Sequence, residues 1–249
     1  MQLPYLITIF IFGAIFGSFF NVVILRLPKK ESIIHHSSHC PNCQEHIKSY
    51  DLIPIVSYFI LGGKCRNCSQ HISWRYPLIE TLTAVSFTLV YSVYGYSYFS
   101  VIGILLASLL IIIAMIDIDT MEIYDRFQVL ILVLAFGMLL ITPLPLLDHL
   151  IGFFIISLPF YLIAYLTGGI GGGDIKLIAI AGLLLGYQAT LIAFFIASII
   201  GGLVAVYLLI TKQKERKSLI AFGPYLCVGI YIAYLYGNQI FAWYLNFFS

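Results

Sequence analysis

Long apolar runs, separated by short polar segments, repeat along the whole chain. A helix needs about 20 mostly apolar residues to cross a bilayer, and runs near that length predict about eight spans. The predicted spans are 5–27, 77–95, 99–116, 127–145, 149–167, 175–188, 189–210 and 219–236. The sixth is short, so we expect a tilted helix or a locally thinned bilayer there. The pattern predicts an all-α, polytopic membrane protein.

Composition supports this fold class. Hydrophobic residues make up 61% of the chain, charged residues only 10%, and the mean hydropathy is +1.01. These values exclude an ordinary water-soluble domain. The lipid bilayer is the expected environment, and no nucleic-acid partner is expected.

Lysine and arginine positions predict the orientation, because cytoplasmic loops are enriched in both. They cluster in four places: from Arg26 to Arg75, at Arg126, at Lys176, and from Lys212 to Lys217. With a first span that runs from outside to inside, strict alternation puts all four clusters on the cytoplasmic side. Both chain ends are then outside. The first span reads as a reverse-oriented anchor and not as a cleavable signal, since MQLPYL has no basic segment ahead of the apolar run.

The loop from 28 to 76 is the only sizeable segment expected outside the membrane, and it contains two C-x-x-C pairs. Cys40 and Cys43 form the first, Cys65 and Cys68 the second, and 21 residues separate the pairs. Four thiolates at this spacing are typical of a tetrahedral Zn²⁺ site. A loop this small also needs a cross-link, such as a bound metal ion, to fold. We predict a zinc-binding loop.

Other interpretations of these cysteines stay open. Iron fits the same four-sulfur cage, and disulfides or a thiol redox centre are the remaining alternatives, although a cytoplasmic loop disfavours stable disulfides. The nearby histidines receive no ligand role; they are His35, His36, His39, His46 and His71. Cys227, alone in the last apolar run, is interpreted as a small core residue.

Two aspartates stand where a membrane makes charge costly. Asp117 ends the apolar run VIGILLASLLIIIAMI and opens an acidic segment that continues through Asp119, Glu122 and Asp125. Asp174 follows a cluster of glycines at 168, 169 and 171–173. An ionisable residue at such a place is by default a functional hypothesis. We expect Asp117 to be the buried member of its segment and the others to face water.

The glycine cluster is predicted to allow positive φ and close approach of another chain. A dinucleotide-binding loop is disfavoured, because such a loop follows a strand and both neighbours here are membrane spans. By the inferred topology Asp117 and Asp174 lie at the same membrane face. Two carboxylates in one site share a proton, and such a pair can perform aspartic-protease chemistry.

The residues alone leave alternatives to catalysis. Each aspartate could cap a helix or pair with a cation, Asp174 with Lys176 for example, and intramembrane acids also serve as ion relays. A proton-coupled transporter is one rival class, although repeated halves and midplane acids are not evident. A noncatalytic assembly factor that docks through its zinc loop is another.

Four blocks, in this order, resemble the type IV prepilin peptidases, including the competence prepilin-processing enzymes. They are GSFFNVVILRLPK (17–29), the two C-x-x-C pairs, IDIDTMEIYD (116–125) and GGGDIK (171–176). The resemblance covers nearly the whole chain. One departure is Tyr124, where the family often has proline; Asp119 and Asp125 are the runner-up acids.

The resemblance implies an intramembrane aspartic endopeptidase that removes the basic leader of type IV prepilins or pseudopilins at the cytoplasmic membrane face. It implies Asp117 and Asp174 as the catalytic pair and the four cysteines as zinc ligands. It also implies N-methylation of the new terminal residue with S-adenosylmethionine as donor. The expected division is a first span (1–27), a zinc loop associated with methyl transfer (28–76) and a transmembrane peptidase domain (77–249).

Overall fold

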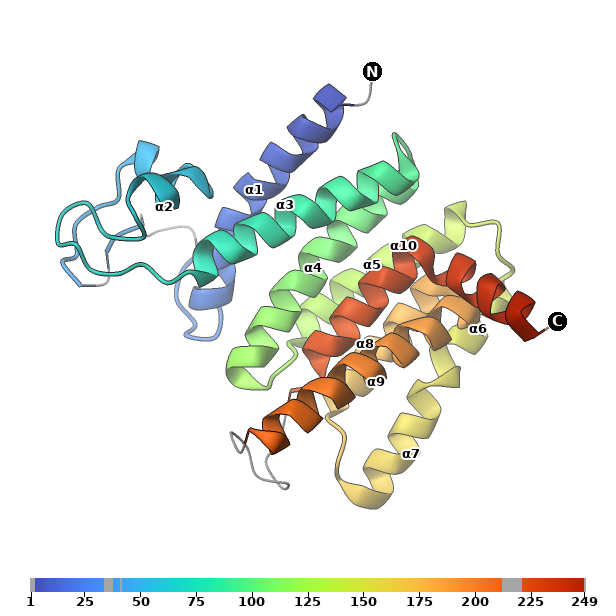
Figure 1. Ribbon diagram of the computed structural model, residues 1–249. Helices are drawn as coiled ribbons and strands as arrows, with labels where there is room; N and C mark the ends of the chain where they lie inside the picture. Colours follow the sequence, from blue (N-terminus) through green and yellow to red (C-terminus); the bar gives the residue numbers. More distant parts are fainter. Residues whose placement is uncertain (1–2, 34–37, 41, 212–220, 249) are drawn as a thin grey trace. The chain divides into compact units, whose positions relative to one another are not determined.

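The computed structural model describes residues 3–33, 38–40, 42–211 and 221–248, and within these the chain is helical (Figure 1). The only extended pairing in the described residues is two isolated bridges in the cysteine loop, His39 with His46 and Lys64 with His71. The chain divides into two compact units, residues 1–100 and 101–249. The expected all-α class is confirmed.

The first unit is a helix pair with the cysteine loop between its members. Helix α1 (Leu3–Arg26) lies beside α3 (Arg75–Tyr94), and the loop carries a 3₁₀ turn, η1 (Ser49–Leu52), and the short helix α2 (Val56–Ile60) (Figure 1). A Cβ built on Gly13 would lie 2.6 Å from the Ala84 Cα, and one on Gly17 2.7 Å from the Glu80 Cα. The two glycines, four residues apart, therefore let the backbones of α1 and α3 touch, as small residues do between membrane helices.

The second unit contains the remaining helices. They are α4 (Tyr98–Thr120), α5 (Asp125–Ile141), α6 (Leu146–Ile155), α7 (Ser157–Thr167), α8 (Gly172–Leu185), α9 (Tyr187–Ile210) and α10 (Gly223–Phe248). Helix α8 packs against α5 and α6, and α9 runs alongside α10 (Figure 1). Gly152 of α6 and Gly182 of α8 meet backbone to backbone. Nearby, Nδ1 of the buried His149 lies 2.8 Å from the Leu183 carbonyl oxygen. These contacts fix α8, the helix that begins beside the candidate site.

Each of the eight predicted apolar ranges is mostly helical where the structure describes it, but the described residues contain six helices long and apolar enough to cross a bilayer. These are α1, α3, α4, the α6–α7 segment taken together, α9 and α10. Helices α5 and α8 have 17 and 14 residues and are shorter than the others. A polytopic membrane protein is confirmed, with six candidate spans.

Several helix bounds differ from the sequence prediction: α10, for example, runs from Gly223 to Phe248, where the sequence predicts 219–236. Two other spans differ for local reasons. The predicted span 149–167 begins earlier, at Leu146, because the helix starts directly after Pro145, and it is interrupted at Ile156, where φ is −106°. The predicted span 175–188 begins at Gly172 and ends at Gly186, whose φ of 79° breaks the helix. The cationic run from Lys212 to Lys217 lies outside the described residues, as do His35 and His36.

Candidate functional site

The acidic segment links α4 to α5 and presents one buried carboxylate. Asp117 lies in the last turn of α4 and is 4% exposed, whereas Asp119, Glu122 and Asp125 are exposed. The expectation that Asp117 is the buried acid of this segment is confirmed. The chain leaves α4 at Met121, a non-glycine residue with φ of 55°, whose N–H donates to the Asp117 carbonyl oxygen. A left-handed residue at this position turns the backbone sharply away from the helix axis.

Tyr124 stands where the resembling family often has proline, and its backbone shows that the turn is kept. Its φ is −71° with ψ of 128°, and proline fixes φ near −65°. Tyr124 therefore adopts the angle that proline would impose. Helix α5 begins at the next residue, Asp125, an acid in the first turn where the helix dipole favours negative charge.

The glycine cluster links α7 to α8 and presents the second carboxylate. Gly168 ends α7 in the left-handed region with φ of 64°, and Gly171 precedes the first turn of α8, which contains Asp174. A Cβ on Gly171 would lie 3.1 Å from Asp174 Oδ2, and one on Gly173 would lie 3.0 Å from the Ile123 side chain. The cluster thus lets the acidic segment approach the α8 backbone closely, as expected from its composition.

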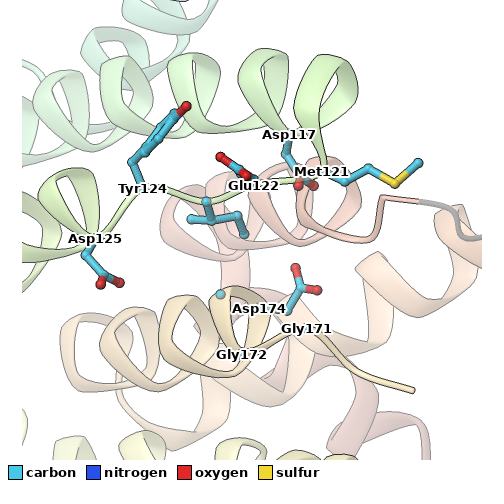
Figure 2. Close-up of a pocket in the computed structure, with 10 residues that line it drawn as sticks. Asp117, Met121, Glu122, Tyr124, Asp125, Gly171, Gly172 and Asp174 are labelled. Atoms are coloured by element: carbon cyan, nitrogen blue, oxygen red, sulfur yellow. The ribbon is translucent and has the colours of Figure 1, made fainter. Parts of the chain in front are cut away.

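The two segments enclose a pocket of about 380 Å³. Its lining consists of residues 121–125 and 171–173 together with Asp117 and Asp174. In Figure 2 the carboxyl groups of Asp117 and Asp174 point toward each other across this pocket. They lie near enough for the charge of Asp117 to act on Asp174. Asp119, one of the runner-up acids, does not line the pocket.

Both carboxyl groups have an oxygen that is buried and free of hydrogen bonds among the described residues, Oδ2 of Asp117 and Oδ1 of Asp174. Buried polar atoms without partners are uncommon and mark sites where a ligand or water completes the bonding. Lys176, considered above as a partner for Asp174, forms a 2.8 Å ion pair with Asp125 instead. The arrangement leaves the facing pair available to a bound water and a substrate.

Two further residues hold this pocket together, and the sequence analysis did not single them out. Gly223, the first residue of α10, brings its backbone to the Asp117 carboxyl group. Gln128 on α5 is 2% exposed and donates from Nε2 to the Gly173 carbonyl oxygen at 3.2 Å. The sequence signal for Gly223 is a glycine directly before a proline at a helix start, and the signal for Gln128 is a glutamine inside an apolar run. Cys227, on α10, is buried as expected.

The four cysteines of the loop form one cluster. Their sulfur atoms all lie within 4.8 Å of one another, and those of Cys40 and Cys68 are 3.7 Å apart. A Zn–S distance of about 2.3 Å in a tetrahedron gives a sulfur–sulfur separation of roughly 3.8 Å. The cluster could therefore hold a tetrahedral metal ion. Within the described part of the loop no histidine belongs to it.

The two C-x-x-C turns are built alike and face each other. In each turn the first cysteine's N–H donates to the carbonyl five residues on, Glu45 for Cys40 and Gln70 for Cys65. The asparagine of each turn contacts a cysteine of the other turn. The side-chain amide nitrogen of Asn42 lies 3.7 Å from the Cys68 sulfur, and that of Asn67 lies 3.9 Å from the Cys43 sulfur.

Hydrogen-bond donors favour the thiolate form of Cys40 and Cys68, whereas burial and the neighbouring sulfurs of Cys68 and Cys40 raise the pKa of Cys43 to about 11. Backbone N–H groups of Cys43 and Asn42 hold the pKa of the Cys40 thiol below its usual range. The Gln70 backbone N–H and the Asn42 side-chain amide lower the pKa of Cys68 to about 6. A thiolate is the form that coordinates metal.

An ion pair links two separate parts of the cysteine loop. Arg66 bonds Asp51 of η1 through both carboxylate oxygens, at 2.9 and 2.6 Å. Such two-point contacts fix orientation as well as distance. The pair connects η1 to the second C-x-x-C turn.

Comparisons with known proteins cover both units. Residues 11–94 match the family model described as the bacterial peptidase A24 N-terminal domain, and residues 104–206 match that of the type IV leader peptidase family. No solved structure matches the chain.

Full-length relatives agree with the family models. A prepilin leader peptidase/N-methyltransferase of Bacillus subtilis (strain 168) is 36% identical over 244 residues, which span 96% of this chain and 97% of that protein. Proteins of the same name are 34% identical in Neisseria gonorrhoeae, over 95% of this chain and 93% of theirs, and 32% identical in Aeromonas salmonicida, over 97% and 94%.

Proposed function

This chain belongs to the type IV leader peptidase family, and on that premise we propose that it is an intramembrane aspartic endopeptidase. Its substrates would be type IV prepilins or pseudopilins, cut between the basic leader and the apolar stem. The observation that carries the proposal is the facing pair of carboxyl groups, Asp117 and Asp174, in one pocket (Figure 2). The family and the names of the relatives support this substrate class.

The pair supplies both halves of a hydrolysis. One carboxylate takes a proton from a water molecule as the water oxygen attacks the scissile carbonyl carbon, and the protonated partner gives its proton to the carbonyl oxygen. When the intermediate collapses, the C–N bond breaks, a hydroxyl proton returns to the pair, and the departing nitrogen takes a proton from the pair. The single shared proton is thus restored for the next turnover.

The pocket rim suits an extended, basic substrate. Gly171 and Gly172 expose backbone without side chains, so a substrate strand can approach the pair closely. Glu122 and Asp125 add negative charge at the same rim, although Asp125 is partly neutralised by Lys176. We propose that Glu122 in particular attracts the basic leader.

We propose the chain as a multi-pass protein of the bacterial inner membrane, with the pocket at its cytoplasmic face and both ends outside. The lysine and arginine distribution supports this orientation when α5 and α8 are counted as crossing the membrane along with the six longer spans. A secreted pilin precursor presents its basic leader on that side. The division into a first span (1–27), a cysteine loop (28–76) and a peptidase domain (77–249) belongs to the same proposal.

For the loop we propose a structural Zn²⁺ held by Cys40, Cys43, Cys65 and Cys68. The sulfur spacing supports this assignment, as do the lowered pKa values of the Cys40 and Cys68 thiols. When bound, the metal would supply the cross-link that folds a loop with little core. The second half of the relatives' name supports N-methylation of the new terminus. S-adenosylmethionine is the proposed donor.

Cleavage of a purified prepilin-like substrate tests the peptidase assignment. The wild type, Asp117→Asn and Asp174→Asn would be compared in detergent, each checked for folding by helicity and monodispersity. Asp119→Asn is the matched control, since it removes an exposed acid from the same segment but outside the pocket. We expect both pocket variants to be inactive and the control to cut. Cleavage by a folded pocket variant would contradict the assignment.

A further inference from the structure

One uncharged segment of the cysteine loop carries a high density of exposed apolar side chains. Residues 52–63 read LIPIVSYFILGG and contain no charged residue. The exposed members are Leu52 (42%), Ile53 (49%), Val56 (50%), Phe59 (72%) and Ile60 (73%). Isolated exposed apolar residues are ordinary, but a contiguous group marks an interaction surface.

A buried hydrogen bond fixes where this segment lies. The Ile55 N–H donates to Oε2 of Glu80 at 2.7 Å, and Glu80 on α3 is only 7% exposed. Glu80 follows Arg75, the first residue of α3, by five positions, which is about 7 Å along a helix. The segment is therefore attached to α3 well inside the end of that candidate span.

Helix α1 places the same attachment point deeper in the membrane than α3 does. Gly17 is in backbone contact with Glu80, and it lies nine residues before Arg26, about 13 Å inside the end of α1. The polar headgroup layer occupies roughly 5–8 Å on each side of the hydrocarbon core. The attachment point of the segment thus lies between the headgroup boundary and the outer part of the acyl chains.

The local backbone turns the apolar side chains outward. Ile55 has φ of 64°, a left-handed value that β-branched residues rarely adopt, and the bond to Glu80 holds it there. Tyr58 faces the loop, where its hydroxyl donates to the Ile72 carbonyl oxygen at 3.4 Å. Val56, Phe59 and Ile60 are left on the exposed side of α2. A helix this short cannot cross the membrane, but it can lie in its surface.

We propose that residues 52–61 are an interfacial segment that inserts Val56, Phe59 and Ile60 into the lipid beside α1 and α3, anchored by the Ile55–Glu80 bond. The lipid surface of the two spans continues into the segment, since Leu78 and Leu82 of α3 are also exposed. Trp74, 67% exposed directly before α3, is a residue type typical of this depth. Exposed Lys29 and Lys30 at the loop start suit anionic headgroups. The four-cysteine cluster is then held against the membrane surface.

Depth-dependent fluorescence quenching tests this assignment in the full-length protein. Trp74→Phe and Trp243→Phe remove the native tryptophans, and Phe59→Trp or Ile60→Trp then adds one probe. The protein is placed in phosphatidylcholine–phosphatidylglycerol vesicles whose acyl chains are brominated near the headgroup. We expect strong quenching of both probes by the brominated lipid and weak quenching by aqueous acrylamide.

Gln70→Trp in the same background is the matched control, because residue 70 is exposed in the second C-x-x-C turn. It should be quenched by acrylamide and not by the lipid. If the probes at 59 and 60 behave like this control, the proposal is overturned. Protection of those probes by an added prepilin-type substrate, without lipid quenching, would likewise overturn it in favour of a protein occupant.

The anchor is tested separately with Phe59→Trp as reporter. Glu80→Ala leaves the Ile55 N–H without an acceptor and should remove most of the lipid quenching, whereas Glu80→Gln keeps an acceptor oxygen and should retain it. Metal content and helicity verify that both variants are folded. Equal lipid quenching in Glu80→Ala and the wild-type background would overturn the role of Glu80 as anchor.

Discussion

Gly223 begins α10 directly against the carboxyl group of Asp117. A Cβ built on this glycine would lie 2.5 Å from Asp117 Oδ2 and 3.1 Å from the end of the Ile123 side chain. No side chain fits without moving the carboxyl group or α10. The start of the last helix therefore packs directly against one of the two carboxyl groups of the pocket, which the α4–α5 and α7–α8 connections line.

Gly223→Ala is expected to abolish most leader cleavage while the protein remains folded. The added methyl group displaces Asp117, and a shift of about 1 Å in a catalytic group costs on the order of 100-fold in rate. Gly202→Ala is the matched control, because a Cβ there meets nothing within 4 Å. Steady-state cleavage rates of the two variants check the prediction; equal rates would contradict it.

Gln128→Leu should lower kcat with little change in KM. The change removes the bond to the Gly173 carbonyl oxygen, which holds the backbone beside Asp174, and a net hydrogen bond of about 1 kcal/mol corresponds to a three- to tenfold loss. Gln188→Leu on α9 provides the comparison, as that amide bonds only the neighbouring Tyr187 hydroxyl. A larger effect in the α9 variant would refute a positioning role for Gln128.

Glu122→Lys should slow cleavage of basic leaders more than cleavage of leaders whose cations are replaced by neutral residues. Glu122 lines the pocket, and its attraction for the leader is Coulombic, so added salt should narrow the difference. Asp119→Lys makes the same charge change away from the pocket lining. The difference in cleavage rate between basic and neutral leaders should therefore be smaller in this variant than in Glu122→Lys. Equal slowing of cleavage for both leader types would rule out Coulombic attraction of the leader by Glu122.

Asn42→Ala and Asn67→Ala should each weaken metal binding, by about 10- to 100-fold, the range found for groups that support metal ligands. The two effects should be similar, because each side-chain amide contacts a cysteine sulfur of the opposite turn, Asn42 that of Cys68 and Asn67 that of Cys43. Competition with a zinc chelator gives the affinities. His71→Ala, in the second turn but outside the four-sulfur cluster, should leave them unchanged.

Removal of the metal should affect the loop and not the carboxyl pair. Chelation is expected to expose the loop near Arg66 to trypsin, because the C-x-x-C turns lose their cross-link. Leader cleavage should persist, since every residue that lines the pocket belongs to the second unit. Activity and proteolysis measured on the same chelated sample separate the two effects. Loss of cleavage that zinc restores would contradict the separation.

The sequence predicts those features that depend on local pattern. The apolar runs predict helices in all eight ranges, the C-x-x-C spacing predicts one sulfur cluster, and the end of an apolar run predicts the burial of Asp117. Each follows from residues near one another in the chain, for which periodicity and spacing are informative.

Features that depend on distant partners were missed. Glu80 lies inside a predicted span, and its carboxylate accepts from the Ile55 N–H, which is 25 residues away in the chain, and from the Ser18 side chain of α1. The sequence alone does not show the role of Gly223, because that role depends on the contact between the start of α10 and the Asp117 carboxyl group. The break at Ile156 and the short lengths of α5 and α8 are likewise not indicated by the apolar pattern.

The position of Gly223 also has a consequence for biosynthesis. Asp117 and Asp174 leave the ribosome long before residue 223, yet the backbone that borders Asp117 arrives only with the last helix. A nascent chain that carries both acids therefore still lacks the backbone that packs against Asp117. The packing around the Asp117 carboxyl group is therefore completed by the last helix to be synthesised.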